Sequence, residues 1–208
     1  MKDQFSLLKE KAVEYFSFMA ITAIVLQAPF IDILILKNPI TEISLTECLG
    51  EFFLAVIIGI YTYLAIRCPK IRYGMILIAG FFTCMLIREF DFFFDSISVS
   101  WCYIAMAITV VCIILAIKNK ESTVRGLADF CRGKFYFIMV CGLVNLFVFS
   151  RLLGMGLLWR HLLGDFYVRI VKNAVEEATE LFSYTLCLIA SVKYARVTLS
   201  RKFGNSAI

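Results

Sequence analysis

Apolar stretches long enough to cross a lipid bilayer recur along the whole chain, and they constrain its fold more than any other feature. A bilayer core about 30 Å thick is crossed by about 20 helical residues. We therefore expect an all-α polytopic membrane protein, a bundle of six transmembrane helices joined by short loops. The predicted spans lie at about residues 13–36, 48–67, 74–95, 101–118, 135–159 and 171–196.

The composition excludes a soluble globular protein. Hydrophobic residues make up 61% of the 208 residues and charged residues only 18%, against roughly 25% in soluble domains. A soluble chain of this length exposes too much surface to bury six wholly apolar helices. No connection is rich enough in Pro, Gly or Ser to link domains, so residues 1–208 are expected to form one integral membrane domain.

Lysine and arginine are unevenly distributed over the ends of the predicted spans. The N-terminal segment, the second and fourth loops and the C-terminal tail hold fifteen of them, whereas the odd-numbered loops hold four. Because basic residues concentrate on the cytoplasmic side, both termini are expected in the cytoplasm of a multi-pass cell-membrane protein, in a bacterium the inner membrane. The net charge of +5 indicates anionic lipid headgroups on that side as partners, and nothing requires nucleic acid.

The longest connection, NKESTVRGLADFCRGK, allows two interpretations. It can form an amphipathic turn of helix at the membrane interface, or it can be a solvated loop.

Charged residues interrupt several predicted spans near their outer ends. Fourteen uncharged residues separate Tyr73 from Arg88, about 21 Å of helix, so a span that enters at Gly74 carries Arg88 into the hydrocarbon. The second and sixth spans are likewise too short in uncharged residues to cross the bilayer. Arg151 lies at a similar depth in the fifth span. The candidate site is this cluster of buried charges, which comprises Glu51, Arg88, Glu89, Asp91, Arg151, Glu176, Glu177 and Glu180.

Ionisable groups at this depth cost roughly 2.5 to 3.5 kcal/mol each to insert, so they are expected to face the bundle interior and form pairs. Arg88 should pair with a carboxylate of the second or sixth span. On the third span, Arg88, Asp91 and Asp95 are spaced so that they share one face of the helix. Since carboxylates outnumber the two arginines, at least one of Glu176, Glu177 and Glu180 should hold a proton or a cation unless two arginines reach them. Glu180 is predicted to be this glutamate because it lies deepest in the membrane.

Two segments share a pattern. TECLGEFF in the second span and EEATELF in the sixth each carry glutamates four residues apart, with an aromatic residue two positions after the second glutamate. Either the two helices are related elements that flank one site, as in transporters built from repeats, or the match is a coincidence.

Sequence motifs of nucleotide binding and acyl transfer are absent, and His161 is the only histidine. The eight cysteines are scattered singly, so most of them are interpreted as packing residues. We expect no cofactor, with a hard divalent cation bound by carboxylate oxygens as the one alternative.

Three classes of function remain open. The cluster can handle protons or hard cations, as in a channel or transporter. It can instead be a structural clasp that fixes the bundle, a partner or a homo-oligomer. The least favoured class is an enzyme that uses a carboxylate as general acid or base on a lipid headgroup. The excess of carboxylates over arginines favours ion handling.

Overall fold

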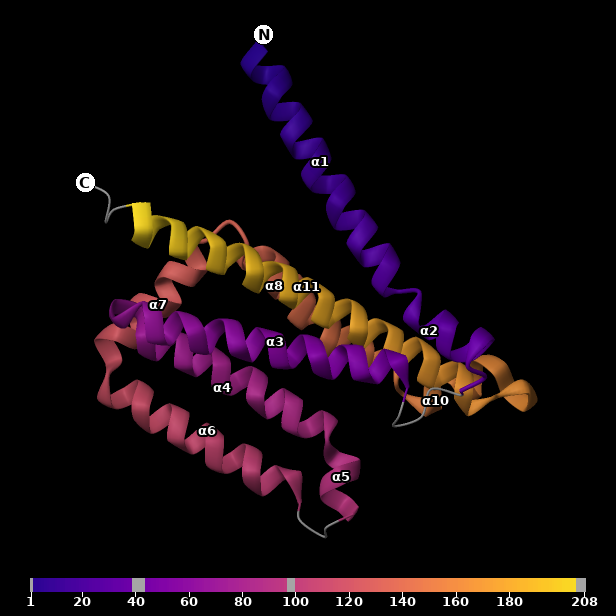
Figure 1. The fold of residues 1–208 in the computed structure, drawn as a ribbon. Helices are drawn as coiled ribbons and strands as arrows, with labels where there is room; N and C mark the ends of the chain where they lie inside the picture. Colours follow the sequence, from indigo (N-terminus) through magenta and orange to yellow (C-terminus); the bar gives the residue numbers. More distant parts are fainter. Residues whose placement is uncertain (1, 39–43, 97–99, 205–208) are drawn as a thin grey trace.

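The computed structural model describes residues 2–38, 44–96 and 100–204, and every regular element in these ranges is a helix (Figure 1). Five helical segments of the described chain are long and apolar enough to cross a membrane, namely Gln4–Ile35, Leu45–Arg67, Pro69–Glu89, Trp101–Lys118 and Tyr136–Leu153. The prediction of an all-helical protein with several membrane-length apolar helices is confirmed. The sixth predicted span is not among the five.

The first apolar segment consists of three elements, α1 (Lys2–Val25), α2 (Ala28–Phe30) and the π-helix η1 (Ile31–Ile35). Helix α1 diverges from the other helices (Figure 1). An ion pair between Glu14 and Lys193 ties its middle to the last helix.

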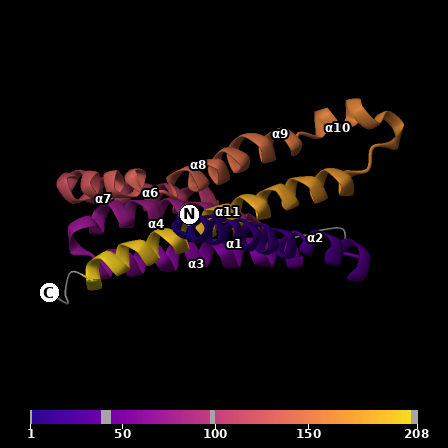
Figure 2. The same cartoon turned by 90° about the horizontal axis from the view of Figure 1, so that it is seen from above.

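The remaining long helices lie side by side and alternate in direction (Figures 1 and 2). They are α3 (Leu45–Arg67), α4 (Arg72–Glu89), α6 (Trp101–Lys118), α8 (Tyr136–Val144), which continues through the π-helix η3 (Asn145–Ser150) into α9 (Arg151–Leu153), and α11 (Arg169–Gly204). Shorter elements connect them: η2 (Pro69–Ile71), α5 (Asp91–Ser96), α7 (Lys120–Arg132), α10 (Gly156–Leu163) and η4 (Gly164–Phe166).

Helix α11 is the central element, because it packs against α3, α8 and η3 and also contacts α1. The buried residues of α3 recur at helical spacing, so they form one face toward α4 and α11; they include Leu54, Ile57, Tyr61 and Leu64. The Tyr61 ring stacks on Phe82 of α4, with ring centroids 6.2 Å apart, and on Tyr194 of α11, at 6.3 Å. Side-chain packing therefore joins these three helices, as expected where lipid offers no hydrophobic gain.

Three predicted spans are not single continuous helices, and the first, over 13–36, is interrupted between Val25 of α1 and Ala28 of α2. Helix α4 ends at Glu89, Phe90 leaves the helical conformation, and α5 begins at Asp91. The predicted span over 74–95 is therefore not one continuous helix. The predicted shared face of Arg88, Asp91 and Asp95 includes Asp95, whose side chain lies outside the described residues. The predicted span over 135–159 ends at Leu153, since Met155 is extended before α10 begins.

The connection after α6 folds as a helix, α7, and not as a plain loop. Its buried residues are Thr123, Gly126 and Phe130. A Cβ atom on Gly74 of α4 would lie 2.8 Å from the Cα atom of Gly126, so the two backbones touch at this point. Only glycine allows so close an approach of α7 to α4.

Candidate functional site

An open pocket of about 620 Å³ lies at the end of the bundle where α3 and α11 begin and α4 and α9 end. Figure 2 shows α8, α9 and α10 diverging from α11 toward this end. Ten residues that line the pocket are charged, namely Glu47, Arg88, Glu89, Asp91, Arg151, Arg169, Lys172, Glu176, Glu177 and Glu180. Seven of the eight predicted site residues belong to this set. The eighth, Glu51, lines a small cavity beside it.

Glu180 is the residue on which most contacts converge. It is 4% exposed, and it forms an ion pair with Arg151 of α9. The Nη2 atom of Arg88 lies 3.5 Å from its Oε2 atom, and the Ser150 hydroxyl donates a hydrogen bond of 2.6 Å to its Oε1 atom. The predicted pairing of Arg88 with a carboxylate on another helix is confirmed. Glu180 thus joins α11 to α4, η3 and α9.

Glu89 is bound from two directions. It forms an ion pair with Arg88 next to it in the chain, and the Tyr184 hydroxyl donates a hydrogen bond of 2.7 Å to its Oε1 atom. Tyr184 lies on α11 and is 3% exposed. This bond is a second polar link between α4 and α11.

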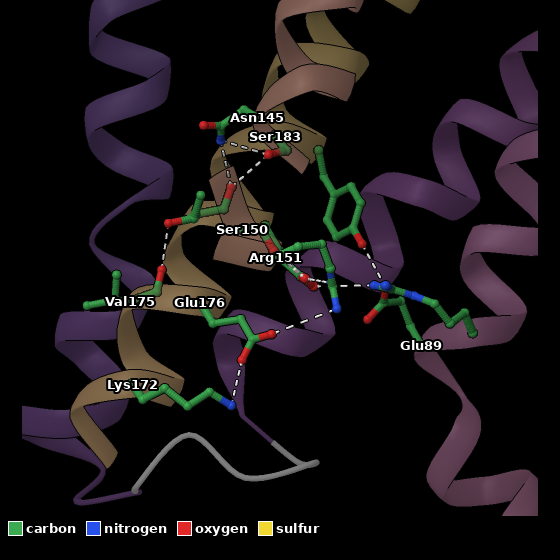
Figure 3. Close-up of polar contacts among 12 residues, drawn as sticks. Glu89, Asn145, Ser150, Arg151, Lys172, Val175, Glu176 and Ser183 are labelled. Carbon is green, nitrogen blue, oxygen red and sulfur yellow. Dashed lines mark hydrogen bonds and ion pairs between the residues drawn. The ribbon is translucent and has the colours of Figure 1, made fainter. Parts of the chain in front are cut away.

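Glu176 lies between two cations, as Figure 3 shows. Its Oε1 atom is 3.8 Å from Nη1 of Arg151, and its Oε2 atom is 2.8 Å from Nζ of Lys172. The carboxylate also approaches Gly154, where an added Cβ atom would lie 2.3 Å from Oε1. Glycine at position 154 therefore leaves room for this ion pair.

Glu51 and Glu177 differ from these three glutamates. In the part of the chain that the structure describes, neither makes a hydrogen bond or an ion pair. Both line the small cavity, of about 20 Å³, which three more carboxylates also line, those of Glu47, Glu89 and Glu180. A cavity of this size has room for about one water molecule. Five carboxylates from α3, α4 and α11 thus surround this small cavity, and all of them except Glu51 also line the open pocket.

Two π-helices position residues around the site. Asn145, at the start of η3, donates hydrogen bonds to the Thr179 carbonyl oxygen (3.1 Å) and to the Ser183 hydroxyl (2.8 Å). These bonds hold η3 against α11. The last residue of η3, Ser150, and the first residue of α9, Arg151, both contact Glu180; Ser150 and Arg151 are labelled in Figure 3. Such π-helical segments are frequent at functional sites.

The other π-helix, η1, carries Asp32, which is fully buried. The Asp32 carboxylate accepts hydrogen bonds from the backbone N–H groups of Leu45 (2.8 Å) and Thr46 (2.9 Å) and from the Thr46 hydroxyl (2.6 Å). Asp32 therefore caps the N-terminus of α3, next to Glu47. Sequence reasoning missed this role, because the residues that Asp32 caps lie thirteen and fourteen positions away.

The two segments with matching glutamates come together. The glutamates of TECLGEFF lie at the start of α3 and those of EEATELF near the start of α11, and these helices pack side by side in the same direction. Asp91, in contrast, is exposed at the pocket margin, since it follows the break after α4.

Among the described residues, no three His, Cys, Asp or Glu side chains are arranged to hold a metal ion. The hard divalent cation stays a prediction. The chain matches no protein-family model, no curated protein and no solved structure.

Proposed function

We propose that this protein takes up protons from the outside of the cell and conducts them inward, as a small channel or transporter. In this proposal α11 is the sixth membrane span, both termini are cytoplasmic, and the charged pocket opens to the outside. The concentration of lysine and arginine at the opposite end of the bundle supports this orientation.

The observation that carries the proposal is that Glu51 and Glu177 make no hydrogen bond or ion pair within the described ranges 2–38, 44–96 and 100–204. A carboxylate that is half-buried beside other carboxylates, with no cation bound to it, gains most from taking up a proton. Glu177 also lines the open pocket, so it can exchange protons with outside water. We therefore assign proton uptake to Glu177.

Glu180 has a different role in this proposal. Two arginines reach it, which is the condition under which the sequence argument expects an ionised carboxylate. The charge of Glu180 is compensated, so the residue acts as a structural clasp. The sequence argument assigned the exchangeable proton to Glu180. The present proposal assigns it to Glu177, which lies about one helical turn earlier.

A line of buried polar side chains on α11 supports conduction beyond the pocket. Tyr184, Cys187, Ser191 and Tyr194 recur at intervals of three and four residues, and each is at most 3% exposed. The Ser191 hydroxyl donates to the Tyr61 hydroxyl at 3.3 Å. At the other end of the line, the Tyr194 hydroxyl donates to Asp129 at 2.9 Å, and Asp129 lines a second hollow of about 390 Å³.

The alternative function is purely structural. Glu180 links α4, η3, α9 and α11 through two arginines and a serine, an arrangement that also suits a clasp with no transported ion. The two functions differ in what happens at Glu177, which the clasp does not use.

A flux assay in proteoliposomes separates the two. The purified protein is reconstituted with a pH-sensitive dye inside, and a pH gradient is applied, with Na⁺, K⁺, Mg²⁺ and Ca²⁺ gradients as further arms. Wild type should conduct protons, Glu177→Gln should abolish the flux with the fold intact, and Glu121→Gln, an exposed glutamate on α7, should not change it. Absence of proton flux in wild type, or undiminished flux in Glu177→Gln, overturns the proposal.

A further inference from the structure

Two adjoining hollows at the end of the bundle opposite the charged pocket form a surface that shares only Asp129 with the proposed proton path. One hollow, of about 490 Å³, is lined mainly by polar and charged residues of η2, the end of α6 and the start of α7. The other, of about 750 Å³, has an apolar floor formed by Ile71, Val124 and Ala128. The hollows share Lys70, Lys120, Glu121 and Arg125, so they are continuous.

The charge of this surface is strongly positive. Its cations are Lys70, Lys118, Lys120, Arg125 and Arg132, whereas its carboxylates are Glu121 and Asp129. Both carboxylates already have partners, because Glu121 pairs with Arg125 at 3.2 Å and Asp129 pairs with Arg201 at 3.4 Å. Within the described chain, Lys70, Lys118 and Lys120 have no ion pair, and all three are exposed. The polar hollow thus presents three uncompensated ammonium groups.

The helix that carries much of this surface is held firmly in place. Its buried side packs through the contact of Gly126 with Gly74, and the Thr123 hydroxyl donates 3.1 Å hydrogen bonds to the carbonyl oxygens of Ala116 and Asn119. The Ser122 hydroxyl donates to the Lys70 carbonyl oxygen at 3.3 Å. The opposite side of α7 exposes Val124, at 66%. The two hollows are therefore preformed on a fixed support.

We propose that this surface, the α7 surface, binds an anionic phospholipid. Its phosphate lies in the polar hollow against Lys70, Lys118 and Lys120, and the upper part of an acyl chain lies on the apolar floor. A basic hollow directly beside an apolar one matches an amphiphile with a negative headgroup, and basic pockets between membrane helices recognise such headgroups. A free phosphate ester would use the polar hollow alone.

The test is a lipid-binding titration of the full chain in a neutral detergent, with native mass spectrometry as the readout of bound lipid. The probes are phosphatidylglycerol, phosphatidylcholine with the same acyl chains, and glycerophosphoglycerol, which is the same headgroup without chains. Phosphatidylglycerol should bind saturably. The triple variant Lys70→Gln, Lys118→Gln, Lys120→Gln should bind it about a hundredfold more weakly, at about 1 kcal/mol per cation.

A control triple variant removes the same charge elsewhere, at Lys9, Lys134 and Arg196, and should bind as wild type does. A second variant, Val124→Asp, should weaken phosphatidylglycerol binding through the apolar floor while it leaves the lysines in place. The proposal is overturned if the first triple variant binds phosphatidylglycerol as tightly as wild type does. It is also overturned if the control triple variant loses as much affinity as the first. Glycerophosphoglycerol that binds as tightly as the lipid assigns the surface to a free phosphate ester and also overturns it.

Discussion

Arg151 and Glu180 form an ion pair in which the carboxylate is buried and the guanidinium is exposed to the pocket. The Glu180 side chain is 5% exposed, whereas the Arg151 side chain is 45% exposed at the pocket. The carboxylate therefore depends on its partners for solvation, while the guanidinium also reaches water. This asymmetry makes Glu180 the anchor of the cluster and Arg151 a replaceable support, since Arg88 also reaches the same carboxylate.

Arg151→Leu should lower the free energy of unfolding by about 2 kcal/mol. That value lies between the cost of losing an exposed ion pair and the 3 to 5 kcal/mol of breaking a fully buried one. The additional removal of Arg88 should cost more than the sum of the two single changes, because Glu180 then has no cation. Unfolding in mixed micelles of mild detergent and dodecyl sulfate measures both.

Arg160→Leu is the matched control for these variants. Arg160 lies near the same end of the bundle but rests over the Tyr167 ring, 5.6 Å from its centroid, and has no ion pair in the described chain. It should change the free energy of unfolding little. A loss at Arg160 as large as that at Arg151 contradicts a special role for the Glu180 pair.

Gly154→Ala should displace the Glu176 carboxylate, since the new methyl group would lie 2.3 Å from Oε1. Overpacking of this kind costs about 1 to 3 kcal/mol. Gly59→Ala provides the contrast, because nothing lies within 4 Å of its Cβ position, and it should stabilise α3 slightly. Thermal unfolding in detergent compares the two, and a Gly154→Ala variant as stable as wild type would show that Glu176 needs no such clearance.

Single cysteines on a cysteine-free background test the proposed orientation. A cysteine at Asp165 should react with an impermeant maleimide on intact cells, and one at Lys120 only after lysis. The reason is the concentration of basic residues at the α7 end of the bundle. Labelling of Lys120→Cys on intact cells contradicts the orientation.

A helix could be predicted accurately from the sequence where almost all of its residues are apolar. Trp101–Lys118 was predicted to the residue, because α6 has a single buried residue, Ala105, and its apolar surface faces outward. Helix α11 shows the limit of the same rule. Glu176, Glu177 and Glu180 lie on α11, which packs against α3, α8 and η3, and they interrupt its apolar stretch. Apolar length alone therefore does not identify this helix as a span.

The sequence indicated which charged residues gather at this end of the bundle, but not which carboxylate the two arginines share. Each charge stood out against an apolar stretch, which is how Glu51 and Arg151 were found. Which carboxylate two arginines share depends on the break at Phe90 and on the π-helix before Arg151, and neither leaves a signal in residue spacing. The sequence argument chose Glu180 as the protonated glutamate because it lies deepest, and no signal in the sequence shows that Arg88 and Arg151 both reach it.

Tyr61→Phe tests the inward path along α11. The change removes only a hydroxyl that accepts from Ser191, so the fold should persist while proton flux in proteoliposomes falls severalfold. Tyr63→Phe is the control, because Tyr63 is 43% exposed and lies off the line. If flux is unchanged in Tyr61→Phe while Glu177→Gln abolishes it, protons leave the pocket by another path.

The most direct test of the account is the protonation of Glu177, read from carboxyl-stretch infrared difference spectra between pH 4 and pH 9. Wild type should show a protonated carboxyl band at pH 7 that disappears in Glu177→Gln and remains in Glu180→Gln. A wild-type spectrum with no protonated carboxyl at pH 7, or a band that Glu177→Gln leaves unchanged, would contradict proton uptake at Glu177.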